Sequence, residues 1–203
     1  LAGACLSWAS LVHGAQGATG EQVFEILASE IALQRGEPAL AYQTYLSLAR
    51  QTGDPQLAQR AMEIAIAANA PELALDAATV WDKLAPGTDT KPKEVLVTLL
   101  MLNQRWSDSV KPAIALLQKQ NAENQERTLK QFQPLLGRAT DEAAAMRAYF
   151  EIINALKPLP TDSAILYTYA MAAEKAGRFD VMESTLRQIL KKTPNDANAH
   201  KCG

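Results

Sequence analysis

Histidine and cysteine are scarce in this chain of 203 residues, which contains two of each. His13, His200, Cys5 and Cys202 all lie near the two ends. CxxC and HExxH spacings are absent, which excludes the two common kinds of zinc site built on them. The motifs GxGxxG, GxxxxGK[ST] and GxSxG are absent as well, and no histidine in the body of the chain could activate a serine or cysteine nucleophile. The sequence therefore predicts no enzyme, no metal site and no cofactor.

Aromatic residues and excess charge are also in short supply. Aromatics make up 6% of the chain, and 20 basic against 22 acidic residues leave a formal net charge of -2. A near-neutral chain offers no electrostatic case for binding nucleic acid, which needs a basic face. Hydrophobic residues at 48% and charged residues at 21% are ordinary for a folded protein. The low aromatic content favours helices over a β-sandwich.

The chain has one uncharged apolar run at its start, Leu1–Val12. About twelve residues are too few to span a bilayer as a helix, which needs about 20, but they suit the apolar core of a secretory signal. Small residues follow, and cleavage after Ala15, Gly17 or Ala18 would fit them. We therefore expect residues 1–18 to be the remnant of a signal peptide, truncated at its start. A first buried helix is the alternative.

Cys5 offers a second interpretation of this segment. The residues Ala2-Gly3-Ala4-Cys5 resemble the cleavage box of bacterial lipoproteins, in which the cysteine becomes the lipid-bearing first residue. Ala2 stands where leucine is usual, and the apolar run resumes after Cys5. Cys5 is thus a lipidation candidate, and a residue of the signal core is the alternative.

From Glu21 onward the apolar residues recur at helical spacing. The clearest stretch begins at Ser163, stops at Gly177 and continues in a second amphipathic segment to Pro194. Glycine suits the left-handed residue that ends a helix, and proline cannot continue one. This is a helical hairpin of about 34 residues, which needs stacked neighbours to bury its faces.

Related breaks recur along the chain near positions 53, 86, 121, 160 and 194, with spacings of 33, 35, 39 and 34. This pattern resembles the tetratricopeptide repeat (TPR) family, whose period is 34. The resemblance implies an all-α, right-handed solenoid of stacked antiparallel helical hairpins, with about five repeats. It covers residues 21–203, in units of about 21–53, 55–86, 88–121, 122–160 and 163–196. Asn69 takes the place of Gly177 in the second unit.

The resemblance also identifies residues that carry the repeat signature and are expected to be structural. They are Gly36, Ala41, Tyr45, Ala74, Pro86, Ala148, Pro160, Ala170, Gly177, Phe179, Leu186 and Pro194. Met62 departs from the small residue of the pattern, and we expect Pro134 and Gly137 to interrupt the first helix of the fourth unit. Asp141 and Glu142 are expected to begin a helix. A further unit begins after Pro194, so we expect the natural protein to continue beyond Gly203.

The family's geometry implies that partner proteins or peptides bind on a concave face lined by the first helix of each hairpin. The positions expected to face this groove are Ile26, Glu30, Gln59, Glu63, Glu94, Thr98, Tyr167, Met171 and Glu174. They are polar with a negative bias, and Tyr167 and Met171 are possible anchors. Because they lack a Lys/Arg cluster, the chain is not expected to clamp a terminal carboxylate. Solvated helix faces are the alternative.

The array is also similar to the envelope TPR proteins of proteobacteria, including lipoproteins that bring cell-wall hydrolases to a processing protease. This likeness implies a non-catalytic adaptor in the bacterial periplasm, anchored at the outer membrane if Cys5 is lipidated. Two alternatives remain: the accessory repeat region of a larger enzyme, and a cytosolic helical interaction module.

Overall fold

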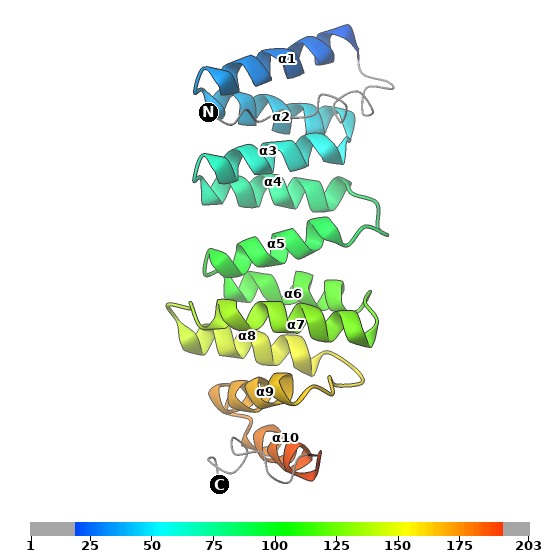
Figure 1. The fold of residues 1–203 in the computed structure, drawn as a ribbon, viewed down its shortest axis with the longest axis vertical. Helices are drawn as coiled ribbons and strands as arrows, with labels where there is room; N and C mark the ends of the chain where they lie inside the picture. The colour runs from blue at the N-terminus through cyan, green and yellow to red at the C-terminus, as the bar shows by residue number, and fades with distance from the viewer. Residues whose placement is uncertain (1–18, 193–203) are drawn as a thin grey trace, which may run out of the picture. The chain divides into compact units, whose positions relative to one another are not determined.

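The computed structural model describes residues 19–192, and these residues form ten helices and no strand. The chain divides into two compact units, residues 1–92 and 93–203. The first contains α1 (Gly20–Gln34), α2 (Pro38–Thr52), α3 (Pro55–Ala67) and α4 (Pro71–Leu84). The second contains α6 (Trp106–Leu117), α7 (Ala122–Leu136), α8 (Glu142–Asn154), α9 (Ser163–Lys175) and α10 (Phe179–Lys192), and α5 (Lys91–Leu102) begins at the boundary. The fold is the all-helical fold expected (Figure 1).

Short local signals begin and end the helices of the first unit. Thr19 forms a capping box with Gln22 at the start of α1, and the side chain of Asp54 caps α3. Prolines occupy the first position of α2, α3 and α4, where a missing N–H costs nothing. The loops that join these helices are therefore only a few residues long.

Residues with a left-handed backbone mark equivalent turns within successive hairpins. Gly36 and Gly177 have φ of 77° and 72°, as the repeat pattern predicts, and Asn69 takes the same conformation with φ of 53°. Gln104 does so as well with φ of 60°, at the turn between α5 and α6. In these four hairpins the turn joins the first helix to the second, whereas Gly137, between α7 and α8, has a right-handed backbone with φ of -66°.

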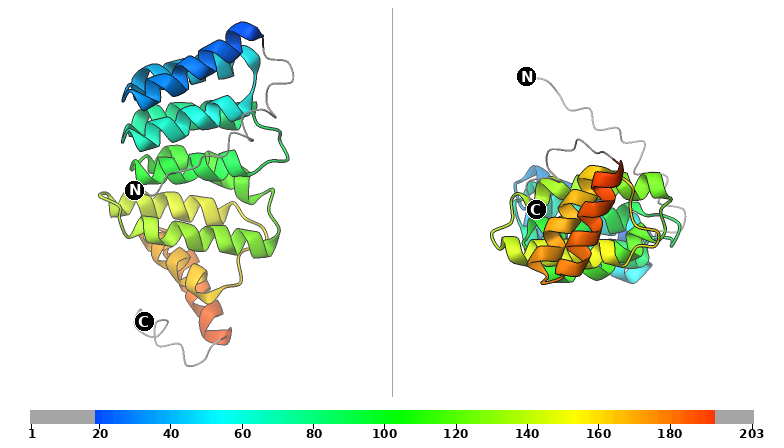
Figure 2. Two further views of the ribbon diagram at one scale, coloured as in Figure 1. Left: turned by 45° about the horizontal axis from the view of Figure 1, so that its top comes forward. Right: turned by 90° about the horizontal axis from the view of Figure 1, so that it is seen from below.

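The first unit stacks two hairpins through a core rich in alanine. Helix α2 lies against α1 and α3, and α3 lies against α4 (Figure 2). Alanines with less than 2% exposure lie in α2, α3 and α4, next to larger buried side chains such as Tyr45, Leu48 and Trp81. Small residues let helix axes approach closely, so the hairpins of this unit pack together with few aromatic side chains between them.

The second unit has a core of larger side chains and a less regular hairpin. Leu129 and Phe132 of α7 and Tyr149 of α8 are buried in it, and the rings of Phe150 and Tyr169 stack with centroids 5.5 Å apart. Helix α6 lies directly against α8. The backbone of α7 comes close to those of α6 and α8 at only a few points. The prediction that Pro134 interrupts the first helix of this hairpin is wrong, because α7 continues through Pro134 to Leu136. Gly137, which was predicted to interrupt the same helix, is the residue that ends it. Pro134 lies in the last turn and its side chain is exposed.

Helix α7 is joined to the start of α9 by polar side chains. Glu126 Oε1 accepts hydrogen bonds from the backbone N–H of Thr161 and Asp162, at 2.7 and 3.1 Å, and from the Thr161 hydroxyl at 3.0 Å. Lys130 Nζ lies 2.6 Å from Asp162 Oδ2. Asp162 in turn caps α9 by accepting from Ala164 and Ile165. These contacts fix the position of α9 in the second unit.

Most of the signature residues lie in these packing surfaces. Ala41, Tyr45, Ala74, Ala148, Ala170 and Leu186 are all buried. Asp141 caps α8, and Glu142 lies in its first turn. Phe179 differs from the others, since it begins α10 with its side chain 60% exposed, whereas the matching Trp106 is only 3% exposed. Pro86 is exposed and Pro160 buried; Pro194, Cys5 and the proposed cleavage sites lie outside the described residues.

Candidate functional site

A cluster of polar side chains lies on the face that α1 and α3 form in the first unit. Arg60 of α3 donates from Nε and Nη2 to Glu30 Oε1 of α1, at 3.2 and 3.0 Å, and from Nη2 to Oε2 at 3.1 Å. The hydroxyl of Tyr45, from α2, donates to the same Oε1 at 2.6 Å. Glu30 therefore receives a two-pronged arginine contact and a hydroxyl at once, which defines its orientation.

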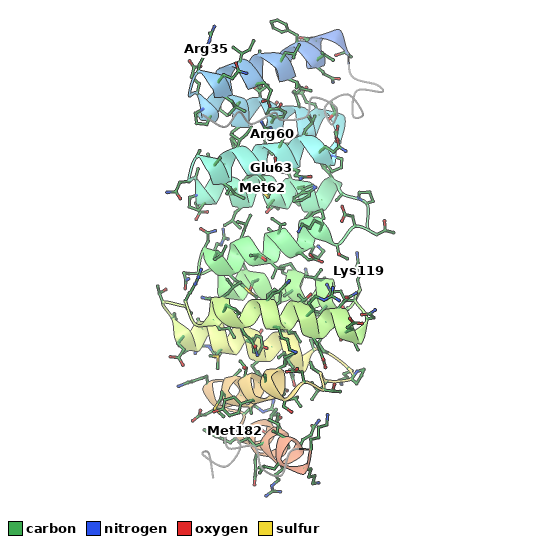
Figure 3. The ribbon with its side chains drawn as sticks, viewed as in Figure 1. Arg35, Arg60, Met62, Glu63, Lys119 and Met182 are labelled. Carbon is green, nitrogen blue, oxygen red and sulfur yellow. The ribbon has the colours of Figure 1, made fainter. Side chains whose placement is uncertain are left out.

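Two further side chains of α3 extend this cluster. Glu63 Oε2 lies 3.7 Å from Arg60 Nη1, and Gln59 Nε2 donates to Glu63 Oε1 at 3.0 Å. Figure 3 shows Arg60 and Glu63 on α3. We call the set Glu30, Tyr45, Gln59, Arg60 and Glu63 the α1–α3 cluster.

The α1–α3 cluster is neither buried nor fully solvated. The side chains of Glu30, Arg60 and Glu63 are 30%, 38% and 45% exposed, while Tyr45 is buried beneath them. Burial, and then the adjacent Glu30 carboxylate, raise the pKa of the Tyr45 hydroxyl, so it stays protonated and remains a donor. Two carboxylates and one guanidinium give the surface a net charge of -1. Such a surface can hold a partner by hydrogen bonds and charge.

Three of the residues predicted to face a groove thus come together, namely Glu30, Gln59 and Glu63. Arg60 was missed, because the helical pattern assigned it no role. A sequence signal for it exists: Arg60 precedes Glu63 by three residues, which places both on one side of a helix.

The other predicted groove residues lie in the second unit. Glu94 and Thr98 are neighbours on α5, where the Thr98 hydroxyl donates to the Glu94 carbonyl oxygen at 2.8 Å. On α9, Tyr167 and Met171 are partly buried against a cluster of Leu166, Ala170, Leu186 and Ile189, and Glu174 is exposed. Ile26, on α1, is partly buried.

The opposite face of the first unit, formed by α2 and α4, carries a second polar group. The Tyr42 hydroxyl donates to the Leu73 carbonyl oxygen at 3.0 Å and to Asp76 Oδ2 at 3.3 Å. Arg50 donates to both oxygens of Asp76, at 3.2 and 3.1 Å. Burial, and then the charge of Asp76, raise the pKa of Tyr42 to about 12. These side chains line an open hollow of about 330 Å³, and they tie α2 to α4.

Nothing in the described part of the chain resembles a metal centre or a membrane span. No three His, Cys, Asp or Glu residues between positions 19 and 192 group closely enough to hold a metal ion. Among the same residues, no helix has the length and apolar character needed to cross a bilayer.

Comparison with known sequences finds one curated relative of clear similarity. No family model matches the chain. A TPR repeat-containing protein of Pseudomonas aeruginosa is 24% identical over 160 residues, which cover 79% of this chain and 26% of the relative. The chain therefore spans about a quarter of the length of that relative.

Several solved structures have a similar arrangement of helices. YrrB, described as a TPR protein with an unusual peptide-binding site, is 11% identical, with 96% of each chain covered and a TM-score of 0.46. MamA is 14% identical, with 88% of this chain and 96% of MamA covered and a TM-score of 0.46. A MamA fragment from Desulfovibrio magneticus RS-1 is 12% identical, covering 88% and 99% of the two chains with a TM-score of 0.44.

Proposed function

We propose that the chain is a tetratricopeptide-repeat protein and a non-catalytic scaffold, which binds a partner protein or peptide on the face of α1 and α3. The α1–α3 cluster is the observation that carries this proposal. Its side chains are held in place by one another before any partner arrives, so binding would cost little additional side-chain entropy.

The chemistry of the cluster indicates what the partner offers. Glu63 contacts Arg60 only at 3.7 Å and is 45% exposed, so its carboxylate retains room for another donor. Arg60 is fully engaged by Glu30 and is better suited to orienting than to capturing an anion. A partner segment with a lysine, an arginine or amide groups fits this surface best.

The setting we propose is the bacterial envelope, reached by export through the segment 1–18. The support is the apolar run Leu1–Val12 followed by small residues. In this setting the scaffold would act as an adaptor in periplasmic or outer-membrane machinery, such as one that brings a hydrolase to a protease. Lipidation of Cys5 would add peripheral anchoring at the membrane.

Two other functions differ from this proposal in what they require. An accessory region of an enzyme would need chemistry elsewhere in a longer protein, and the curated relative is about four times the length matched here. A cytosolic module would need an amino terminus that is not processed.

Site-specific crosslinking in cells tests the scaffold proposal. A photoreactive amino acid is placed at Gln59 in the α1–α3 cluster and, as a matched control, at the exposed Gln43 of α2. We expect one specific partner captured from position 59 and not from 43. Glu63→Lys should reduce this capture, whereas the same charge reversal at the exposed Glu151 of α8 should not.

The outcomes separate the alternatives. Equal capture from positions 59 and 43, or capture insensitive to Glu63→Lys, would contradict binding at the α1–α3 cluster. Mass spectrometry of the amino-terminal peptide shows in the same experiment whether cleavage falls before Cys5 or at positions 15–18. Cytosolic partners and an uncleaved amino terminus would contradict export.

A further inference from the structure

A segment of four residues recurs in α1 and α3 at the spacing of the repeat. Residues 30–33 read Glu-Ile-Ala-Leu and residues 63–66 read Glu-Ile-Ala-Ile, 33 positions further on. Gly36 and Asn69, the left-handed residues of the turns that follow, are separated by the same 33 positions. Equivalent places in two hairpins therefore carry a carboxylate and, three residues later, a large aliphatic side chain.

The first copy of this segment shows which group its carboxylate binds. Arg60 donates from Nη2 to both oxygens of Glu30, at 3.0 and 3.1 Å. The equivalent carboxylate, Glu63, comes no closer to Arg60 than 3.7 Å and is 45% exposed. Glu30 is thus occupied by a guanidinium of this chain, whereas Glu63 can receive the same kind of group from a partner.

An exposed aliphatic side chain lies next to Glu63 on α3. Ile66 is 50% exposed, whereas Ile64 and Ala65, between the two, are buried. Gln59, Glu63 and Ile66 are separated by four and three residues, so they fall in one narrow row along the solvent side of the helix. We call these three residues the α3 row.

The spacing within the α3 row suits an extended peptide. Residues three apart on a helix have Cβ atoms about 5–6 Å apart. In an extended peptide every second side chain points the same way, and two such residues lie about 6.6 Å apart. Gln59 donates to Glu63 through Nε2, and its Oε1 accepts no hydrogen bond from the described part of the chain. This oxygen can accept from a backbone N–H of the peptide.

We infer that the partner presents an extended segment in which one residue separates an arginine or lysine from a large aliphatic residue. The basic side chain pairs with Glu63, and the aliphatic side chain covers Ile66. The net charge of -1 on the α1–α3 cluster favours a basic segment. This inference rests on the proposed function and adds to it the chemistry of the partner.

Three peptides of identical composition test the spacing on the full chain. They are Gly-Ser-Arg-Thr-Leu-Ser-Gly, Gly-Ser-Thr-Arg-Leu-Ser-Gly and Gly-Arg-Ser-Thr-Leu-Ser-Gly, all with uncharged ends. One, no and two residues respectively separate arginine from leucine. Titration followed by amide NMR spectra gives the Kd of each peptide and the amides that shift. We expect the first peptide to bind about fivefold more tightly than the others, with shifts centred on residues 59–67.

Two variants test the contacts one at a time. Glu63→Gln and Ile66→Ser should each weaken binding of the first peptide roughly threefold. Glu151→Gln on α8 and Leu73→Ser on α4 alter residues of comparable exposure away from the α3 row and should leave it unchanged. Added salt should weaken binding to the parent chain more than binding to Glu63→Gln, because it screens the ion pair.

Several results would overturn this inference. Equal binding of the three peptides, or shifts outside α3, would exclude recognition by the α3 row. Tightest binding of the third peptide would indicate a helical partner segment and contradict an extended one. Capture from position 59 in cells together with any of these results would overturn the inference and leave the proposed function standing. Absence of that capture would overturn the proposed function itself.

Discussion

At the scale of a single residue, Glu126 shows that the contact between neighbouring hairpins depends on individual polar side chains. One carboxylate oxygen satisfies two backbone N–H groups and a hydroxyl at the start of α9. These donors, the Thr161 N–H first, lower the pKa of Glu126, because they favour its charged form.

This lowered pKa predicts how stability changes with pH. A carboxylate whose pKa is lower in the folded state contributes stability above its unfolded pKa, with a reference value of 4.5, and loses it as the pH falls through the folded value. We expect Glu126→Gln to lower the melting temperature at pH 7, and the difference from the parent chain to shrink progressively below about pH 4.5.

Thermal unfolding followed by circular dichroism between pH 7 and pH 3 measures this effect. Glu151→Gln, at an exposed position of α8, is the control and should run parallel to the parent chain. A Glu126→Gln difference that stayed constant down to pH 3 would refute the charge-based explanation.

At the scale of the helical elements, turns depend on backbone conformation more than on contacts. Gly177 joins α9 to α10 with φ of 72°, and a Cβ added there would meet no atom within 4 Å. The conformation alone therefore decides what can replace it, since a left-handed backbone costs an ordinary residue about 1–2 kcal/mol.

Gly177→Ala should thus destabilise the second unit by about 1 kcal/mol, although it removes no contact. Gly20→Ala is the matched control: it also has open space around its Cβ, but it begins α1 without a positive φ. That substitution should be neutral or slightly stabilising. Urea unfolding of both variants measures the difference, and equal effects would contradict the argument from φ.

Helix boundaries were largely predictable because they depend on neighbouring residues. Asp141 begins a helix as expected, and Gly36 and Gly177 adopt the conformation their positions required. Pro134 was wrongly expected to interrupt its helix. A proline in a last turn loses one hydrogen bond, and the burial of Leu129, Phe132 and Leu136 on the same helix outweighs that loss.

At the scale of the whole molecule, each of the two compact units has a buried tryptophan that can report on it. Trp81 is 6% exposed in the first unit and Trp106 is 3% exposed in the second. Stability in repeat arrays is approximately a sum over neighbouring hairpins. A core defect should therefore weaken its own unit most.

We expect Leu48→Ala, which costs about 2–5 kcal/mol, to lower the urea midpoint seen by Trp81 more than the midpoint seen by Trp106. Leu129→Ala should do the reverse. Single-tryptophan chains, with Trp8 and the other tryptophan replaced by phenylalanine, allow the two fluorescence transitions to be compared. Midpoints that move together in both variants would show that the chain unfolds as one cooperative body.

The sequence alone determined that the chain is helical, where its hairpins turn and which small residues pack between them, because these properties depend on local spacing and on backbone conformation. Tertiary structure decided which side chains meet. Arg60 reaches Glu30 because α1 and α3 both pack against α2, and periodicity within one helix cannot reveal a partner 30 positions away.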